Sequence, residues 1–333
     1  MKIAVIGAGG WGTALALHLD SIGHETALWA HSPETIRAIA DSPSRENAKY
    51  LPGVRVPERI LATSDRAAAA AGAELVVMAV PSRHSRAVCA GFRGAVEPGA
   101  IAVSVSKGFC PETLRRLAET SAEAMGLADA VALSGPSHAE EVARGIPTAL
   151  VAASADIALA KKTQEVFTGA RLRVYASTDI AGVELGGAVK NILALAVGMS
   201  DGLGFGDNSR AALITRGLAE MARFGVAMGG RAETFAGLSG LGDLVATCTS
   251  RHSRNRGVGE RLGRGETLPQ IEAGMRQVAE GVCNCRLVAQ LAEERAIPMP
   301  ICATVLEVLD GRLAPADALP LLMSRDTKHE DFG

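Results

Sequence analysis

The chain begins with Lys2-Ile3-Ala4-Val5-Ile6-Gly7-Ala8-Gly9-Gly10-Trp11-Gly12-Thr13. A short apolar run thus leads into a Gly-x-Gly-x-x-Gly loop, and an alanine- and leucine-rich segment follows the loop. In such a loop Gly7 permits the tight turn, Gly9 lets a pyrophosphate approach the backbone, and Gly12 permits close helix–strand packing. The free N–H groups of the helix then face the phosphates. Because the loop lies between a strand and a helix, it predicts dinucleotide binding rather than a merely glycine-rich turn.

The first half of the chain continues this alternation of apolar runs and helical segments. Predicted strands cover residues 3–6, 25–29, 75–80, 100–105, 130–133, 148–151 and 172–175, and helices include 13–22 and 156–168. Most of the strands are continuously apolar, as expected of strands covered on both faces. The pattern predicts an α/β, Rossmann-type, doubly wound parallel sheet over residues 1–178.

The second half changes character after residue 178, where strand signals stop. Predicted helices cover residues 180–199, 209–228, 255–264, 268–273, 283–295 and 303–309. We therefore expect a mainly α-helical substrate and catalytic domain over residues 179–333. Its longest uninterrupted apolar run, residues 192–199, is too short to span a bilayer. With no signal peptide recognisable after Met1, the expected location is the cytoplasm.

Composition excludes several classes of function. The formal net charge of the 333 residues is −2, so no overall positive field attracts nucleic acid. Aromatic residues make up only 3% of the chain, which disfavours base-stacking surfaces. The 6 cysteines have no metal-ligand spacing and are expected to be buried, reduced thiols, and no metal site is predicted.

The end of the second predicted strand bears on the choice of cofactor. An acidic residue there would bind the ribose 2′-hydroxyl of NAD and repel the 2′-phosphate of NADP. The chain instead has Ala30-His31-Ser32, with Arg37 about one helical turn further on. We expect NADPH to be used at least as well as NADH. Ser32-Pro33 can also serve as a helix cap and first-turn proline, and the two roles are compatible.

A lysine stands in an apolar helical segment, Gly186-Gly187-Ala188-Val189-Lys190-Asn191-Ile192. The two glycines occupy the i−4 and i−3 positions beside Lys190, which leaves room for a ligand or a closely packed partner. Burial would disfavour the charged amine and lower its pKa, which suits a general acid and base for an alcohol–ketone reaction. The alternative is a lysine that extends its amine to solvent.

Three further segments carry polar groups that suit an anionic substrate. Lys107 follows the predicted strand 100–105, at the sheet edge where ligands of such folds bind. Asp243 and Thr247 share a face if their segment is helical.

The third segment is a dense cationic cluster, which consists of Ser250-Arg251-His252-Ser253-Arg254-Asn255-Arg256 together with Arg261 and Arg264. It can be a solvated or nucleic-acid surface, or a clamp for a phosphate at a helix start; the lack of aromatic residues favours the clamp.

Taken together, these residues resemble the soluble, bacterial-type NAD(P)-dependent sn-glycerol-3-phosphate dehydrogenases. The motifs run along the whole chain: Gly7–Thr13, Ser106-Lys107-Gly108, Ser134-Gly-Pro-Ser-His-Ala-Glu-Glu141, Lys190-Asn191, Gly240–Asp243 and Ser253-Arg254-Asn255. The resemblance implies reversible reduction of dihydroxyacetone phosphate to sn-glycerol 3-phosphate, with NAD or NADP as cofactor, for phospholipid synthesis. The chain departs from the family at Gly10, commonly serine, and at His31, where many members have arginine at or beside it.

The resemblance also implies roles for individual residues. Catalytic roles fall on Lys190, as proton donor and acceptor, and on Lys107 and Asp243. Substrate-binding positions are Lys107, Gly135, Ser137, Lys190, Asn191, Asp243, Thr247, Ser253, Arg254 and Asn255. Cofactor-binding positions are Gly7, Gly9, Gly10, Trp11, Gly12, His31, Tyr50, Lys107, Ala139, Arg254, Val278 and Glu280.

Two rival functions fit part of the pattern. A β-hydroxyacid or ketopantoate-type reductase also joins a Rossmann domain to a helical domain with a lysine. Its substrate carries a carboxylate rather than a phosphate, so the phosphate clamp expected at Ser253–Asn255 argues against this function. A non-catalytic NAD(P) sensor has no use for Lys190, Lys107 and Asp243 together. The helical domain makes a homodimer the expected assembly.

Overall fold

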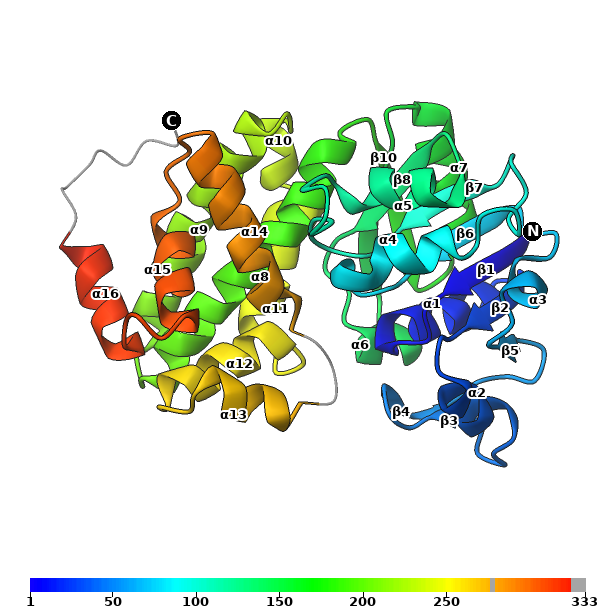
Figure 1. Cartoon of the computed structure of the whole chain (residues 1–333), viewed down its shortest axis with the longest axis horizontal. Coiled ribbons are helices and arrows are strands. Elements are labelled where there is room, and N and C mark those ends of the chain that lie inside the picture. Colours follow the sequence, from blue (N-terminus) through cyan, green and yellow to red (C-terminus); the bar gives the residue numbers. More distant parts are fainter. Residues whose placement is uncertain (276–278, 325–333) are drawn as a thin grey trace. The chain divides into compact units, whose positions relative to one another are not determined.

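The computed structural model describes residues 1–275 and 279–324. The chain divides into two compact units, Met1–Ile180 and Ala181–Gly333. The first unit is an α/β domain, and the second is built from helices (Figure 1).

The first unit is centred on an 8-stranded sheet in the order β10-β9-β8-β7-β6-β1-β2-β5. Its strands are β1 (Lys2–Ile6), β2 (Glu25–Trp29), β5 (Leu61–Thr63), β6 (Leu75–Met78), β7 (Ile101–Ser104), β8 (Ala130–Ser134), β9 (Thr148–Ala153) and β10 (Leu172–Ser177). The glycine-loop strand β1 lies between β2 and β6 and pairs in parallel with both. The turn after β1 therefore opens at the carboxyl edge of the sheet, where the predicted ligand site belongs.

One pairing differs from the all-parallel sheet that the sequence predicts. β8 and β9 run antiparallel, with Leu133 opposite Ala152. The connection between them contains only the five-residue helix α6 (Ala139–Ala143), which packs beside α1 (Gly10–Ser21). Because the chain does not cross the sheet by a long helix there, it re-enters the sheet in the opposite direction.

Both faces of the sheet are covered, as continuously apolar strands require. On one face Ile3 and Val5 pack with α1, α2 (Pro33–Ala40), α6 and α7 (Ile157–Phe167). On the other face Ala4 and Ile6 pack with α3 (Arg66–Ala70), α4 (Ser82–Ala90) and α5 (Leu117–Met125). Alternate residues of one strand therefore enter opposite cores, which is the doubly wound arrangement.

Some short strands are absent from the sequence prediction. β5 adds an edge to the sheet beside β2, and β3 (Glu46–Asn47) and β4 (Leu51–Arg55) form a separate antiparallel pair. These strands are two to five residues long, and only Leu51 and Asn47 of the β3–β4 pair are buried. Such segments carry too little apolar periodicity to be recognised in sequence.

The helical unit contains α8 (Ile180–Gly202), α9 (Asp207–Ala227), α10 (Ala232–Phe235), the π-helix η1 (Leu238–Gly242), α11 (Asp243–Thr249), α12 (Arg254–Gly263), α13 (Leu268–Ala273), α14 (Glu280–Glu294), α15 (Pro300–Leu309) and α16 (Pro315–Met323). The sequence predicts most of the longer helices within a few residues of their ends. It does not predict α10, η1 or α16, of which α16 has no buried residue.

The long helix α8 is the centre of this unit. By length and composition it could cross a membrane, because it continues well beyond the uninterrupted apolar run, but 83% of its apolar window is buried inside the protein. It is therefore a core helix of this unit. Four glycines let α8 and α12 pack with their backbones in close contact. A Cβ on Gly198 would lie 2.1 Å from the carbonyl oxygen of Arg256, and one on Gly259 would lie 2.1 Å from that of Leu195.

Candidate active site

The glycine loop has the geometry that a pyrophosphate site requires. Gly7 has φ +115°, a region that favours glycine, and a Cβ on Gly12 would lie 1.9 Å from the carbonyl oxygen of Gly7. At Gly9, by contrast, a Cβ would meet nothing within 4 Å. No side chain caps the start of α1 at Gly9. The loop is closed on its inner side and open at Gly9, so it fits a dinucleotide at the N-terminus of α1.

A residue that the sequence reasoning missed supports this loop. Asn47 is 1% exposed, and its side-chain amide donates to the carbonyl oxygen of Ala8 and to the hydroxyl of Thr13, each at 2.8 Å. It thereby ties the loop to the first turn of α1. The short strand β3 brings Asn47 to this place, and neither its spacing nor its neighbours in sequence indicate the contact.

Four other predicted cofactor positions lie in the loop or beside it: Gly10, Trp11, Tyr50 and Ala139. A Cβ on Gly10 would lie 2.8 Å from the carbonyl oxygen of Tyr50 and 3.6 Å from Cβ of Ala139. A side chain at position 10 would therefore have to displace the Tyr50 backbone, which accounts for glycine in place of serine. Trp11 is half-buried and packs against the core on the α1 side of the sheet.

At the end of β2, Ser32 caps the following helix. Ser32 caps α2 by accepting from the Thr35 amide at 3.4 Å, and its hydroxyl donates to Glu34 at 3.1 Å. The capping role that the sequence left open is thus present.

His31 and Arg66 both lie beside the Trp29 ring. His31 is exposed, with its ring centroid 6.2 Å from that of Trp29. Arg66 of α3 lies over the same Trp29 ring, at 5.5 Å from the centroid. Arg66 is a candidate phosphate ligand that sequence reasoning missed, since 34 residues separate it from Ser32.

A second group of predicted residues gathers at the carboxyl ends of β7 and β8. The amine of Lys107 donates to the carbonyl oxygen of Gly135 at 3.3 Å, and the hydroxyl of Ser137 donates to the same oxygen at 2.9 Å. Gly135 has φ +138°, so the loop turns sharply there. Ser106 anchors the segment by donating to the carbonyl oxygen of Val80 at 2.5 Å. The structure thus brings Lys107, Gly135 and Ser137 together.

In the helical unit, Lys190 forms a buried ion pair. The residue is 6% exposed, and its amine donates to the carboxylate of Asp243, which is 1% exposed. The amine also donates to the hydroxyl of Thr247 at 2.8 Å. Asp243 and Thr247 lie one helical turn apart on α11, and the Thr247 hydroxyl donates to the carbonyl oxygen of Asp243 at 2.6 Å. The lysine does not extend to solvent, so that alternative is wrong.

This ion pair changes the electrostatic argument made from sequence. Burial alone disfavours an ammonium, but a carboxylate in contact with it favours the charged form. Two hydrogen bonds also fix the direction of the amine. The arrangement therefore suits a proton donor held in its charged state, rather than one made neutral by an apolar helix.

The glycine before Lys190 accommodates protein rather than a ligand. A Cβ on Gly186 would lie 2.5 Å from the backbone oxygen of Ser239 in η1. Of the two possibilities left open by the sequence, the closely packed partner is present at this position. The contact places η1, and with it the start of α11, against α8, so it helps to bring Asp243 to Lys190.

The Ser253–Asn255 segment begins α12. Ser253 caps the helix by accepting from the Arg256 amide at 3.2 Å. Asn255 is largely buried and donates to the side-chain oxygen of Asn191 at 2.9 Å. Asn191 in turn donates to the carbonyl oxygen of Gly187 at 3.2 Å. The two asparagines connect α8 with α12, so part of their hydrogen-bonding capacity is structural.

The same chain of hydrogen bonds reaches α14. The Gly281 amide donates to the side-chain oxygen of Asn255 at 2.9 Å. It therefore anchors the helix that starts at Glu280, a predicted cofactor position. Val278, the other predicted cofactor position in this region, lies outside the described residues.

The cationic cluster is less uniform than its sequence indicates. Three of its arginines pair with acids: Arg256 with Asp201, Arg261 with Glu266, and Arg264 with Glu260. Arg251 and Arg254 are exposed beside the cap of α12. Arg254 is the first residue of α12 and is exposed, which makes it a candidate for binding an anion at this helix start.

A buried thiol lies between these charges. The pKa of Cys248 is raised to about 12, chiefly by burial; the charges of Lys190 and Arg256 act to lower this pKa, and those of Asp201 and Asp243 act to raise it. Because only the thiolate is a good nucleophile, Cys248 is expected to resist iodoacetamide in the native protein at pH 8. Peptide mass spectrometry after native and denaturing alkylation measures this. Native alkylation at the rate of the denatured chain would contradict it.

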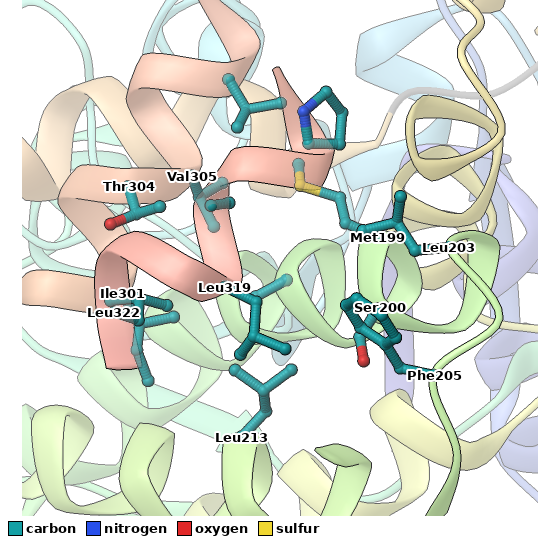
Figure 2. A pocket seen from close by; sticks show the side chains of 14 residues that line it. Met199, Ser200, Leu203, Phe205, Leu213, Ile301, Thr304, Val305, Leu319 and Leu322 are labelled. Atoms are coloured by element: carbon teal, nitrogen blue, oxygen red, sulfur yellow. The ribbon is translucent and has the colours of Figure 1, made fainter. Parts of the chain in front are cut away.

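An apolar pocket in the helical unit is not the active site. Figure 2 shows it between α8, α9, α15 and α16, with Met199, Phe205, Leu213 and Leu319 among its lining residues. No charged side chain lines it, so it has no cation to bind a phosphate, and none of the predicted site residues that the structure describes is among its lining residues.

Comparison with known proteins connects this geometry to one family. Residues 2–160 match the family model for the N-terminus of NAD-dependent glycerol-3-phosphate dehydrogenase, and residues 179–320 match the model for its C-terminus. A glycerol-3-phosphate dehydrogenase [NAD(P)+] from Geobacillus kaustophilus is 49% identical, covering 99% of this chain and 96% of its own. The crystal structure of glycerol-3-phosphate dehydrogenase from Coxiella burnetii has a TM-score of 0.93 at 40% identity, covering 97% of this chain and 99% of that one.

The rival reductase family is much less similar. A PanE/ApbA family ketopantoate reductase from Ralstonia eutropha covers 96% of this chain and 100% of its own, with a TM-score of 0.58 and 18% identity. That likeness shows a shared fold alone.

Proposed function

Since this chain belongs to the NAD(P)-dependent glycerol-3-phosphate dehydrogenase family, we propose that Lys190 is the proton donor in its reaction. The reaction is the reduction of dihydroxyacetone phosphate to sn-glycerol 3-phosphate, with NAD or NADP as coenzyme. The observation that carries the proposal is the buried contact of Lys190 with Asp243 and Thr247. Residues 1–178 would form the NAD(P)-binding domain and residues 179–333 the substrate domain.

The residues divide the chemical work between them. When bound, the nicotinamide supplies the hydride that reduces C2 of the ketone. Lys190 donates a proton to the oxygen on which negative charge develops, while Asp243 and Thr247 hold the amine in one direction. Lys107 adds positive charge at the developing oxyanion, a kind of preorganised stabilisation often worth about 3 kcal/mol per donor. The Gly135 carbonyl oxygen, at the neighbouring strand end, accepts from both Lys107 and Ser137 and so positions the Lys107 amine.

The substrate phosphate is proposed to bind at the start of α12. The hydroxyl of the cap residue Ser253 and the backbone N–H of Asn255 lie in this first turn, and Arg254 adds an exposed guanidinium. A fixed phosphate holds C2 in place for the reaction, which lowers the entropic part of the barrier. On the cofactor side, the open position at Gly9 supports pyrophosphate binding to the Gly7–Gly12 loop.

The direct test is oxidation of NADPH by dihydroxyacetone phosphate, with unphosphorylated dihydroxyacetone and ketopantoate as comparison substrates. We expect turnover with dihydroxyacetone phosphate and little with the other two. Equal turnover of ketopantoate would contradict the assignment of the phosphate site.

The cofactor preference gives a separate prediction. We expect kcat/KM for NADPH to equal or exceed that for NADH, because no acidic residue follows β2 at His31 and Ser32 and the Arg66 guanidinium lies nearby over Trp29. The Arg66→Gln variant should lose efficiency with NADPH and keep it with NADH. A large preference of the unmodified enzyme for NADH would refute the prediction.

Assembly and location follow as part of the same proposal. The enzyme would act as a homodimer in the cytoplasm and supply glycerophospholipid synthesis. Exposed Leu321 and Met323 on α16 support association, and the free cysteines support a reducing compartment.

A further inference from the structure

A second buried ion cluster lies next to the proposed substrate clamp. The carboxylate of Asp201, with only 6% of its side chain exposed, accepts from two arginines. Arg256 approaches one oxygen with Nε at 2.8 Å and Nη2 at 2.7 Å. Arg210 approaches the other oxygen with Nε at 3.2 Å and Nη2 at 2.8 Å. One buried carboxylate therefore holds two guanidiniums.

The cluster joins the ends of three helices. Asp201 lies in the last turn of α8, Arg210 in the first turn of α9, and Arg256 in the first turn of α12. The positive N-terminal ends of α9 and α12 favour an acid between them, and they would repel the arginines without it. Asp207 also pairs with Arg210 and Glu260 with Arg256, but Asp201 is the acid that both arginines share.

Arg256 is directly continuous with the proposed phosphate clamp. Its amide donates to Ser253, and Asn255 precedes it. Close backbone packing at Gly198 and the hydrogen bond between Asn255 and Asn191 keep the first turn of α12 against α8. The ion pair with Asp201 adds a side-chain constraint on the same turn and holds the Arg256 guanidinium at the end of α8.

The cluster also lies within electrostatic reach of the Lys190–Asp243 pair. The Cys248 thiol is buried, and its pKa responds to the charges of Asp201 and Arg256 as well as to those of Lys190 and Asp243. A change at Asp201 is therefore made close to the site and not at a remote surface.

We propose that Asp201 is a positioning residue for substrate: by holding Arg256 it fixes the first turn of α12 and so the Ser253–Asn255 phosphate clamp. This inference rests on the proposed function, because it assigns phosphate binding to that clamp. Asp201 does not touch the substrate in this account and takes no part in proton transfer.

The test is the Asp201→Asn variant, which keeps the shape of the side chain and removes its charge. We expect KM for dihydroxyacetone phosphate to rise by about 10- to 100-fold, as for a binding group displaced by about an ångström. The value of kcat should stay within about threefold, and NADPH affinity should not change. The inhibition constant of inorganic phosphate should rise in parallel with KM.

Two further variants separate positioning from a general structural role. Asp207→Asn is the matched control, since Asp207 also pairs with Arg210 but its side chain is 92% exposed; we expect it to be silent. Arg256→Met should reproduce the rise in KM, and the double variant with Asp201→Asn should be no worse than either single variant.

Three outcomes would overturn the inference. They are an unchanged KM in both Asp201→Asn and Arg256→Met, a loss of kcat without a change in KM, and a lower thermal stability with unchanged kinetics. If Asp201→Asn fails to fold, the KM of Arg256→Met tests the inference instead, because Asp201 keeps its ion pair with Arg210 in that variant. Failure of the unmodified enzyme to reduce dihydroxyacetone phosphate would instead refute the proposed function.

Discussion

Replacement of Lys190 with alanine is expected to lower kcat by about 100- to 10,000-fold, the usual contribution of a positioned general acid. NADPH affinity should remain close to that of the unmodified enzyme, because the Gly7–Gly12 loop that supports cofactor binding lies in the first unit. Steady-state kinetics and a fluorescence titration with NADPH measure the two quantities. Wild-type turnover in the variant would refute the role of Lys190.

The same substitution has a cost to stability that must be separated from catalysis. Asp243 is 1% exposed and would become a buried carboxylate without its ammonium partner. Removing one member of a buried pair typically costs about 3–5 kcal/mol of unfolding free energy. The double variant Lys190→Met with Asp243→Asn removes both charges and should recover much of that stability. It should stay inactive, because no proton donor is restored.

The second large effect is expected at the glycine loop. In Gly12→Ala the new Cβ would lie 1.9 Å from the Gly7 carbonyl oxygen, so α1 must move away from β1. Overpacking of this kind costs about 1–3 kcal/mol. If the displaced loop loses a similar amount of binding free energy, Kd for NADPH rises by about 5- to 150-fold. Chemical denaturation should show the lower unfolding free energy, and titration with NADPH should show the higher Kd.

Gly9→Ala is the matched control within the same loop. Gly9 has φ −72° and ψ 179°, a conformation open to any residue, and its Cβ would meet nothing within 4 Å. The unfolding free energy should therefore be unchanged or slightly raised. NADPH binding should still weaken, because the methyl group occupies the space that a pyrophosphate approaches. Normal NADPH affinity in Gly9→Ala would place the pyrophosphate elsewhere.

The fold was largely predictable because its signals are local. Continuous apolar runs such as those of β1 and β6 indicate strands buried on both faces, and the glycine loop indicates the turn between β1 and α1. The antiparallel pairing of β8 and β9 was not predictable. It depends on where the short helix α6 packs, and that contact with α1 joins segments distant in sequence.

The candidate site divides in the same way. The sequence alone determined which residues are proposed to carry the chemistry, because the motifs around Lys107, Lys190 and Asp243 are short and specific. It could not show that Lys190 and Asp243 form one buried ion pair, since 53 residues separate them. The sequence predicts a lysine whose charged form is disfavoured by burial alone, whereas the structure places a carboxylate against the amine.

The cationic cluster shows most clearly what only the tertiary structure decided. Its arginines look equivalent in sequence, yet the fold pairs Arg256 with Asp201, 55 residues away, and leaves Arg254 exposed at the start of α12. Local sequence determines helix ends, turns and residue types. Which charges meet is decided by the packing of helices through glycines such as Gly198 and Gly259, because an ion pair depends on distance in space and not along the chain.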